Sequence, residues 1–274
     1  MLSLFVAMWC AAAPPMLDEV RRDPAAAVAD ARQRAQRFNG PAVVEAHHGS
    51  HHAAILESVD VTSASILVWW REHDHVAVVV TLREVDRLSH LYPLRFVDTD
   101  DDGSIELLAH SAHDGNTLGS QALLLQPRDG VVIDLFAEAL AQRRGRSHPL
   151  TTRVVNRVVV VVDVVDLRLL EAMPGVPLLQ GPIACLPWTF RAGALHPWRA
   201  DEARLVDAAA ARARRALRDK DADAALIAAS EQALIDLWRG RSVAVALARF
   251  DPVEHLEGVR SDVLAALKQR LAAL

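Results

Sequence analysis

The pattern of hydrophobic and polar residues changes character twice along the chain. Residues 23–38 are rich in helix formers, with Asp23 placed to cap a helix and Pro24 suited to its first turn. Asn39-Gly40-Pro41 then ends the helical pattern. From residue 53 to residue 165, short runs of apolar residues alternate with polar turns, which is typical of strands.

The strand pattern predicts hairpins. Ser65–Trp70 and His75–Leu82 flank the polar REHD, and further pairs of runs flank an acidic stretch and the turn PRDG. Arg153–Val165 is a long β-branched run, which we expect to be one central strand buried on both faces. Because no long helical pattern separates these strands, the fold class predicted is α+β, with an antiparallel sheet or small sandwich followed by helices.

The end of the chain is predicted to be helical. Residues 173–197 are rich in Pro and Gly and are expected to form an irregular connector. Apolar residues then recur at helical spacing in Glu202–Arg218, in Asp221–Trp238 and around Leu264 and Leu267. The predicted organisation is a signal peptide (1–15), an N-terminal helix (16–40), a β-rich domain (41–198) and an α-helical C-terminal region (199–274).

The first fifteen residues, MLSLFVAMWCAAAPP, resemble a secretory signal peptide. The apolar run Leu2–Trp9 precedes an A-x-A cleavage pattern at Ala11–Ala13 and is too short to span a bilayer. The chain is therefore expected to be periplasmic or secreted, and Cys10 is a candidate for a lipid anchor. No Lys or Arg precedes Arg21, so the alternative is a start at Met16 and a cytoplasmic protein.

Composition narrows the classes of function. A net charge of −5 over 274 residues argues against a broad nucleic-acid-binding surface, and no later segment is apolar enough to span a membrane. Two cysteines do not make a disulfide framework, and the apolar neighbours of Cys185 predict a buried, inert thiol. The chain has no GxSxG, GxxxxGK[ST], GxGxxG, HExxH or CxxC motif. Its high content of Ala, Arg, Val and Asp is typical of a GC-rich bacterial genome.

The sharpest motif is the acidic stretch RFVDTDDDGSIELL, residues 95–108. Ca²⁺ binds six or more hard oxygens, and alternate residues of a tight loop can turn their carboxylates inward around a glycine. The predicted ligands are the side chains at positions 1, 3, 5 and 9 and the carbonyl at position 7: Asp98, Asp100, Asp102, Glu106 and Ser104. The alternative is a solvated acidic turn, in which repulsion between the carboxylates would cost stability.

The flanks of this loop distinguish it from an EF-hand. Ala109 stands where an EF-hand carries its bidentate acid, and both flanking segments have a strand pattern. The strand–DxDxDGxxE–strand arrangement resembles the calcium loops of FG-GAP/VCBS-type repeats, which are found in many exported bacterial proteins. The resemblance covers about fifteen residues in a single copy, so it implies the ligand roles but not a propeller.

The second candidate is the stretch HHGSHH, which contains His47, His48, His51 and His52. Histidines four apart can bind Zn²⁺ on one face of a helix, but Gly49-Ser50 interrupts any helix here. The alternative is a polar surface loop.

The expected function is that of a non-enzymatic binding or structural module with a structural Ca²⁺ site. One alternative is a zinc-dependent hydrolase that combines the HHGSHH stretch with His110 or His113, although we expect both of these histidines to be solvated. Another is a protein-interaction module formed by the C-terminal helices. The arginines of the first of these helices otherwise form its solvated face: Arg212, Arg214, Arg215 and Arg218.

Overall fold

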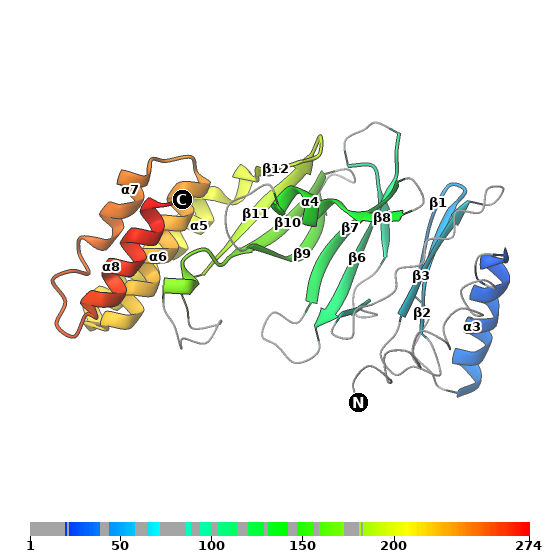
Figure 1. The fold of residues 1–274 in the computed structure, drawn as a ribbon, viewed down its shortest axis with the longest axis horizontal. Helices are drawn as coiled ribbons and strands as arrows, with labels where there is room; N and C mark the ends of the chain where they lie inside the picture. Colours follow the sequence, from blue (N-terminus) through cyan, green and yellow to red (C-terminus); the bar gives the residue numbers. More distant parts are fainter. Residues whose placement is uncertain are drawn as a thin grey trace, which may run out of the picture. The chain divides into compact units, whose positions relative to one another are not determined.

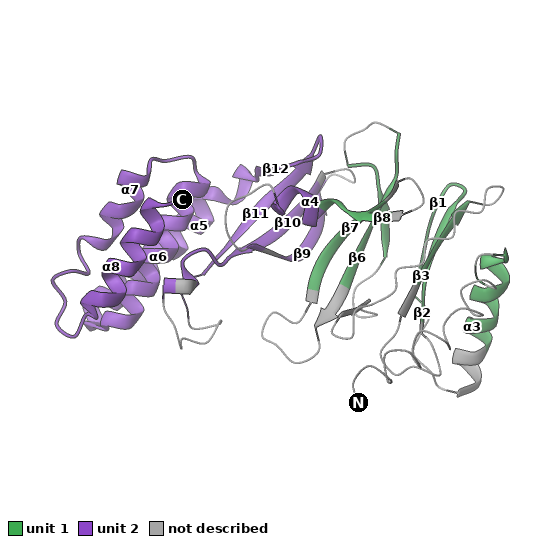
Figure 2. Ribbon diagram, viewed as in Figure 1, with its two compact units in different colours: residues 1–135 green, residues 136–274 purple. Residues whose placement is uncertain are grey.

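The protein, described by a computed structural model, forms two compact units, residues 1–135 and 136–274 (Figure 2). The fold class is α+β, as predicted, with three antiparallel sheets followed by a helical region (Figure 1). The boundary between the units falls inside the range 41–198. The structure describes residues 20, 22–38, 44–57, 65–71, 86–88, 94–99, 103–113, 120–128, 131–141, 147–155, 159–172, 181 and 183–274.

The first sheet lies beside the N-terminal helix (Figure 1). These elements are α3 (Pro24–Phe38), β1 (Val44–His48), β2 (His51–Glu57) and β3 (Ser65–Arg71), and the strand order is β1-β2-β3. Asp23 caps α3 as predicted, because its Oδ1 accepts the backbone N–H of Ala26 at 2.9 Å. Val28 of the helix belongs to one buried cluster with Ala54 and Val68, so burial of this sheet face holds α3 in place.

The second sheet has five strands. They are β4 (Asp86–Leu88), β5 (Arg95–Val97), β6 (Glu106–His113), β7 (Ser120–Arg128) and β8 (Val131–Asp134). Their order is β4-β6-β7-β8, with β5 paired to β6. A buried cluster that includes Ile55 and Trp69 of the first sheet and Phe96 and Leu107 of the second joins the two sheets. The predicted strand His75–Leu82 lies outside the described residues.

The third sheet corrects two predictions from sequence. After helix α4 (Leu135–Ala141), its strands are β9 (Ser147–Val155), β10 (Val159–Asp166), β11 (Ala184–Arg191) and β12 (Ala194–Pro197), in the order β12-β11-β10-β9. Arg153–Val165 is therefore not one strand, because the chain reverses and Val155 pairs with Val159. β10 is nevertheless buried on both faces, since its consecutive valines from Val160 to Val162 are all inaccessible to solvent.

The segment predicted as an irregular connector supplies two strands of this sheet. Pro187 lies within β11, although proline cannot donate to a ladder. It is tolerated in β11 because β12 pairs only from Trp188 onward, so Pro187 has a strand neighbour on one side. Its carbonyl is used instead, accepting the backbone N–H of Trp198 at 3.0 Å and the indole N–H of Trp238 at 3.2 Å.

The predicted C-terminal helices are present. They are α5 (Glu202–Asp219), α6 (Ala222–Trp238) and α8 (Ser261–Ala272), joined by the short α7 (Val243–Leu247) and flanked by the 3₁₀ turns η1 (Leu170–Ala172), η3 (Arg199–Asp201) and η4 (Ala248–Phe250). Asp221 caps α6 by accepting the N–H of Ala224 at 3.0 Å. Leu226, Leu234 and Leu267 are fully buried, as their helical spacing predicts. Among the described helices, none has the length and apolar character needed to cross a membrane.

Candidate functional site

The acidic stretch forms the turn between β5 and β6. Val97 pairs with Glu106 in an antiparallel register, so the strand–loop–strand prediction is confirmed and an EF-hand is excluded. Gly103 has φ of +83°, a left-handed conformation that side chains adopt at a cost. The glycine at position 6 therefore has the role that the motif predicts, which is to permit a sharp turn.

Asp98 folds back over this turn. Its Oδ2 accepts the backbone N–H of Gly103 at 3.1 Å, and this closes a loop of six residues. Its Oδ1 is buried and accepts no hydrogen bond within the described part of the chain. Asp100 and Asp102, two of the predicted ligands, lie outside the described residues, whereas Ser104 is described and exposed.

Glu106 stabilises the turn through hydrogen bonds of its buried side chain. Its side chain is 1% exposed, and its Oε2 accepts both the backbone N–H of Thr99 at 3.0 Å and the Thr99 hydroxyl at 2.8 Å. Its Oε1 accepts the side-chain amide of Gln126, on β7, at 3.2 Å. The predicted metal ligand is thus also a buried brace that fixes the first residues of the loop to two strands. Across the described residues, no three His, Cys, Asp or Glu side chains form a group suited to a metal ion.

The HHGSHH stretch forms the β1–β2 hairpin. His47 pairs with His52 and His48 pairs with His51, so the two pairs lie on opposite faces of the hairpin. His51 Nε2 accepts the Nε–H of Arg71 at 2.8 Å, and burial followed by the Arg71 charge lowers the pKa of His51. The His52 ring stacks on Trp70 with their centroids 5.2 Å apart. The four imidazoles therefore do not converge on one point.

Two side chains differ from their predicted exposure. His110, expected to be solvated, is 5% exposed on β6, and this burial lowers its pKa to about 4. Cys185, expected to be buried, is exposed on β11. Its thiol is still partly desolvated, and this desolvation, together with the nearby Asp163 charge, raises the pKa of Cys185 to about 11. The predicted burial of Cys185 is therefore wrong, and its inertness stays a prediction, which now follows from the raised pKa.

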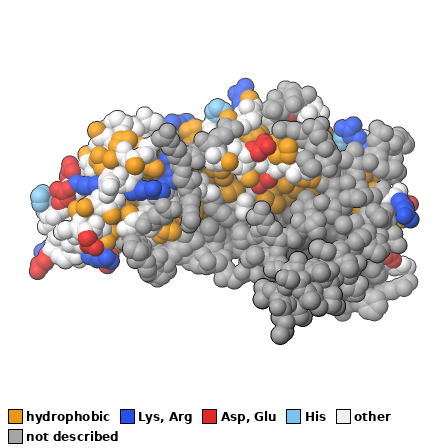
Figure 3. All heavy atoms as spheres, in the orientation of Figure 1, with side chains coloured by type: hydrophobic (Ala, Val, Ile, Leu, Met, Phe, Trp, Pro, Cys, Tyr) orange, Lys and Arg blue, Asp and Glu red, His pale blue; other side chains and the backbone are white. Residues whose placement is uncertain are grey.

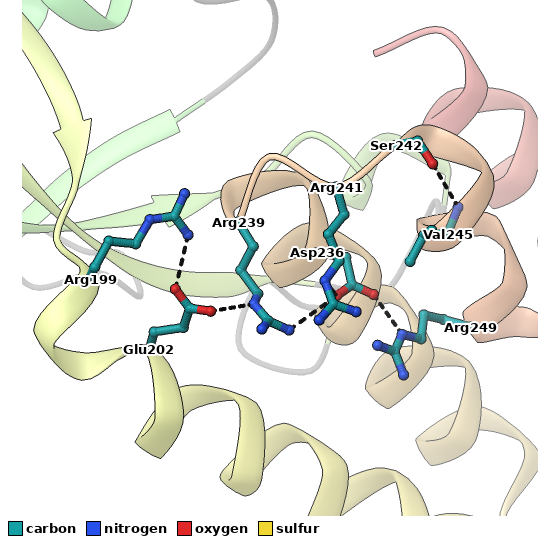
Figure 4. Close-up of polar contacts among 8 residues, drawn as sticks. All are labelled: Arg199, Glu202, Asp236, Arg239, Arg241, Ser242, Val245 and Arg249. Carbon is teal, nitrogen blue, oxygen red and sulfur yellow. Dashed lines mark hydrogen bonds and ion pairs between the residues drawn. The ribbon is translucent and has the colours of Figure 1, made fainter.

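A chain of arginines and carboxylates in the second unit was not recognised in the sequence (Figure 4). Glu202, at the start of α5, accepts Arg239 Nε at 2.6 Å and Arg199 Nη1 at 3.2 Å. The Arg239 guanidinium, followed by Arg199, lowers the pKa of Glu202. The Arg199 guanidinium also lies 4.8 Å from the ring centroid of Trp238.

The same chain continues to Asp236, whose side chain is 2% exposed. Three guanidiniums surround this carboxylate: Arg249 Nε at 2.6 Å, Arg241 Nε at 3.6 Å and Arg239 Nη1 at 3.8 Å. Figure 3 shows basic side chains gathered over the C-terminal helices. Arg239, Arg241 and Arg249 follow Asp236 by three, five and thirteen residues, which is no single helical period. The turn after α6 places the first two, and η4 places Arg249.

No protein-family model, no curated protein and no solved structure matches this chain. Its function is therefore inferred from its own residues.

Proposed function

We propose that the β5–β6 turn binds Ca²⁺ and that the chain is a non-enzymatic binding or structural module of an exported bacterial protein. The observation that carries this proposal is the Asp98 carboxylate. Its Oδ2 is held by the Gly103 N–H, while its Oδ1 is buried and accepts no hydrogen bond from the described residues. Burying a carboxylate oxygen removes its bound water, and this costs free energy unless another group takes the place of that water. A hard cation such as Ca²⁺ can take that place.

The role proposed for the ion is structural. The turn joins two strands whose side chains Phe96 and Leu107 lie in the hydrophobic core of the first unit. Glu106 already fixes the start of the loop through Thr99, so the turn is partly ordered before an ion arrives. A cation that binds only the folded turn stabilises the native state by mass action, by about 2.7 kcal/mol at one hundred times its dissociation constant.

The fifteen-residue resemblance to FG-GAP/VCBS-type loops supports the same role. In such a loop, Asp100, Asp102, Glu106 and the Ser104 carbonyl would complete the coordination around Asp98. Extracellular calcium modules work at dissociation constants of about 10⁻⁴–10⁻³ M, so a weak site would still be filled outside the cytoplasm. The propeller of those proteins is not part of the proposal.

The two alternatives have less support. A zinc hydrolase would need converging imidazoles, whereas the hairpin register divides the four histidines between two faces and Arg71 donates to His51 Nε2. A helical interaction module could use the arginines of α5, but Arg212 is paired with Glu231 of α6, and the exposure of Arg214 and Arg215 is what any solvated helix face shows. Neither alternative is supported by an observation comparable to the buried Oδ1 of Asp98.

The test is thermal unfolding of the full chain with EDTA and then with excess Ca²⁺, together with calorimetric titration. Asp98→Asn is the most informative variant, because its amide oxygen can still accept the Gly103 N–H while the charge is lost. We expect Ca²⁺ to raise the melting temperature of the wild type, and this response to be largely lost in Asp98→Asn.

Asp221→Asn is the matched control. It removes one carboxylate from another backbone-capping position, at the start of α6, and should leave the calcium response unchanged. A wild type that melts at the same temperature in EDTA and in Ca²⁺, with no heat of binding, would refute the proposal. An Asp98→Asn variant that responds as the wild type does would refute it as well.

A further inference from the structure

The arginine–carboxylate chain of the second unit carries more positive than negative charge. Four guanidiniums, those of Arg199, Arg239, Arg241 and Arg249, face the carboxylates of Glu202 and Asp236, and Asp207 lies beside Glu202. The group therefore has a surplus of one positive charge. We propose that the Asp236 end of this chain is a binding site for a phosphate group, held by Arg239, Arg241 and Arg249.

The surplus is located on one side of the group. A pocket of about 360 Å³ lies beside Arg199 and Arg239, but Glu202 and Asp207 line it as well, so its charges balance. At Asp236, by contrast, Arg241 and Arg249 share a single carboxylate, while Arg239, 3.8 Å away, is already paired with Glu202; one positive charge is therefore left over there. An anion therefore gains most by approaching from the Arg241 side of Asp236, outside the pocket.

The buried carboxylate does not saturate these guanidiniums. Only Arg249 is within hydrogen-bonding distance of Asp236, at 2.6 Å, whereas Arg241 and Arg239 are 3.6 and 3.8 Å away. Each guanidinium carries five N–H donors. The two oxygens of one carboxylate cannot accept hydrogen bonds from all the donors of three such groups. The side chains of Arg241 and Arg249 are 41% and 34% exposed, so part of each fork faces solvent.

The backbone positions these arginines before a ligand binds. At the end of α6, the backbone N–H of Gly240 donates to the backbone carbonyl of Leu237, and the backbone N–H of Arg241 donates to the backbone carbonyl of Asp236, each at 2.9 Å. Gly240 has φ of +78°. This is the hydrogen-bond pattern of a Schellman motif, and it turns Arg241 back over the helix end. Arg249 reaches the same carboxylate from η4, so two separate segments, the turn after α6 and η4, supply the guanidiniums (Figure 4).

Phosphate matches this arrangement in charge and in shape. It is an anion, as the positive surplus requires, and its several acceptor oxygens can engage more than one planar guanidinium fork. A monocarboxylate has one charge and two oxygens, and it should bind more weakly. Asp236 keeps the forks oriented while the incoming anion completes their hydrogen bonding.

The test uses the full chain and sodium phosphate at constant ionic strength, with sodium acetate and sodium chloride as comparison salts. The Nε–H signals of the arginines are followed by nitrogen–proton correlation spectra. We expect saturable shifts of Arg239, Arg241 and Arg249 with phosphate. Arg241→Gln should weaken binding by about fivefold, the order expected for one exposed charged contact.

Arg212→Gln is the control, because Arg212 is an exposed arginine in a one-to-one pair with Glu231. It should bind phosphate as the wild type does, and Arg241→Lys, which keeps the charge, should bind more tightly than Arg241→Gln. Sedimentation with phosphatidylcholine vesicles, with and without phosphatidic acid, distinguishes a lipid phosphate from a free one, and either source supports the site. Shifts that follow ionic strength equally in all three salts, or an Arg241→Gln variant that binds as the wild type does, would overturn the proposal.

Discussion

His110 makes the stability of the first unit depend on pH. Its imidazole is 5% exposed on β6, and burial lowers its pKa to about 4 from an ordinary value near 6.5. Between these two values, the unfolded chain takes up a proton at His110 and the folded chain does not. Protonation therefore favours unfolding, so this contribution to stability is complete above pH 6.5 and is lost as the pH falls towards 4.

The size of the effect follows from the two pKa values. Each pH unit within this window lowers the free energy of unfolding by about 1.4 kcal/mol per proton, so the full loss is about 3 kcal/mol. His110→Leu removes the titrating group and keeps an apolar side chain opposite Ala122 on β7. The difference in unfolding free energy between wild type and variant should fall by about 3 kcal/mol from pH 7 to pH 4.

Urea unfolding at pH 7, 6, 5 and 4 measures this difference, and hydrogen exchange of the β6 amides assigns the transition to the first unit. Only the change with pH is compared, so any constant effect of the substitution on stability cancels. His196→Gln removes an exposed imidazole and controls for the loss of a histidine as such. A difference that stays constant from pH 7 to pH 4 would show that His110 is accessible to protons in the folded state.

Two further predictions concern single side chains. Glu106→Gln should lower the free energy of unfolding, measured in urea, by about 1–3 kcal/mol, because the charge-assisted hydrogen bonds from Thr99 and Gln126 are replaced by neutral ones even if the Gln126 amide turns to accept. Cys185, with its pKa raised to about 11, should react with iodoacetamide at pH 8 roughly a hundredfold more slowly than free cysteine, measured by peptide mass spectrometry. Alkylation of Cys185 as fast as free cysteine would contradict this pKa.

The sequence predicted those parts of the fold that depend on neighbouring residues. The caps Asp23 and Asp221 mark helix starts because each bonds a backbone N–H three residues ahead. The valine run was misread because β10 is buried on both faces, so its composition has no alternation that would show where a strand ends. β11 was missed because the cost of Pro187 in a strand depends on which strands flank it.

The candidate sites also differ in whether their contacts are local in the sequence. The Asp98–Gly103 contact spans five residues and could be predicted from the motif. The buried role of Glu106 depends on Gln126, twenty residues away on another strand, and no local pattern indicates it. The group around Asp236 depends on where the turn after α6 and the η4 segment place their side chains, which the sequence spacing alone does not determine.

The sheets are built almost entirely from strands that are neighbours in sequence. Apart from β4 with β6, each strand pair that the structure describes joins consecutive strands, and α5 is followed by α6 after the single residue pair Lys220-Asp221. Closing short loops costs little chain entropy, and such local topologies reach the native state faster than those with distant pairings. Each hairpin can therefore form as soon as its second strand is synthesised, without waiting for the rest of the chain.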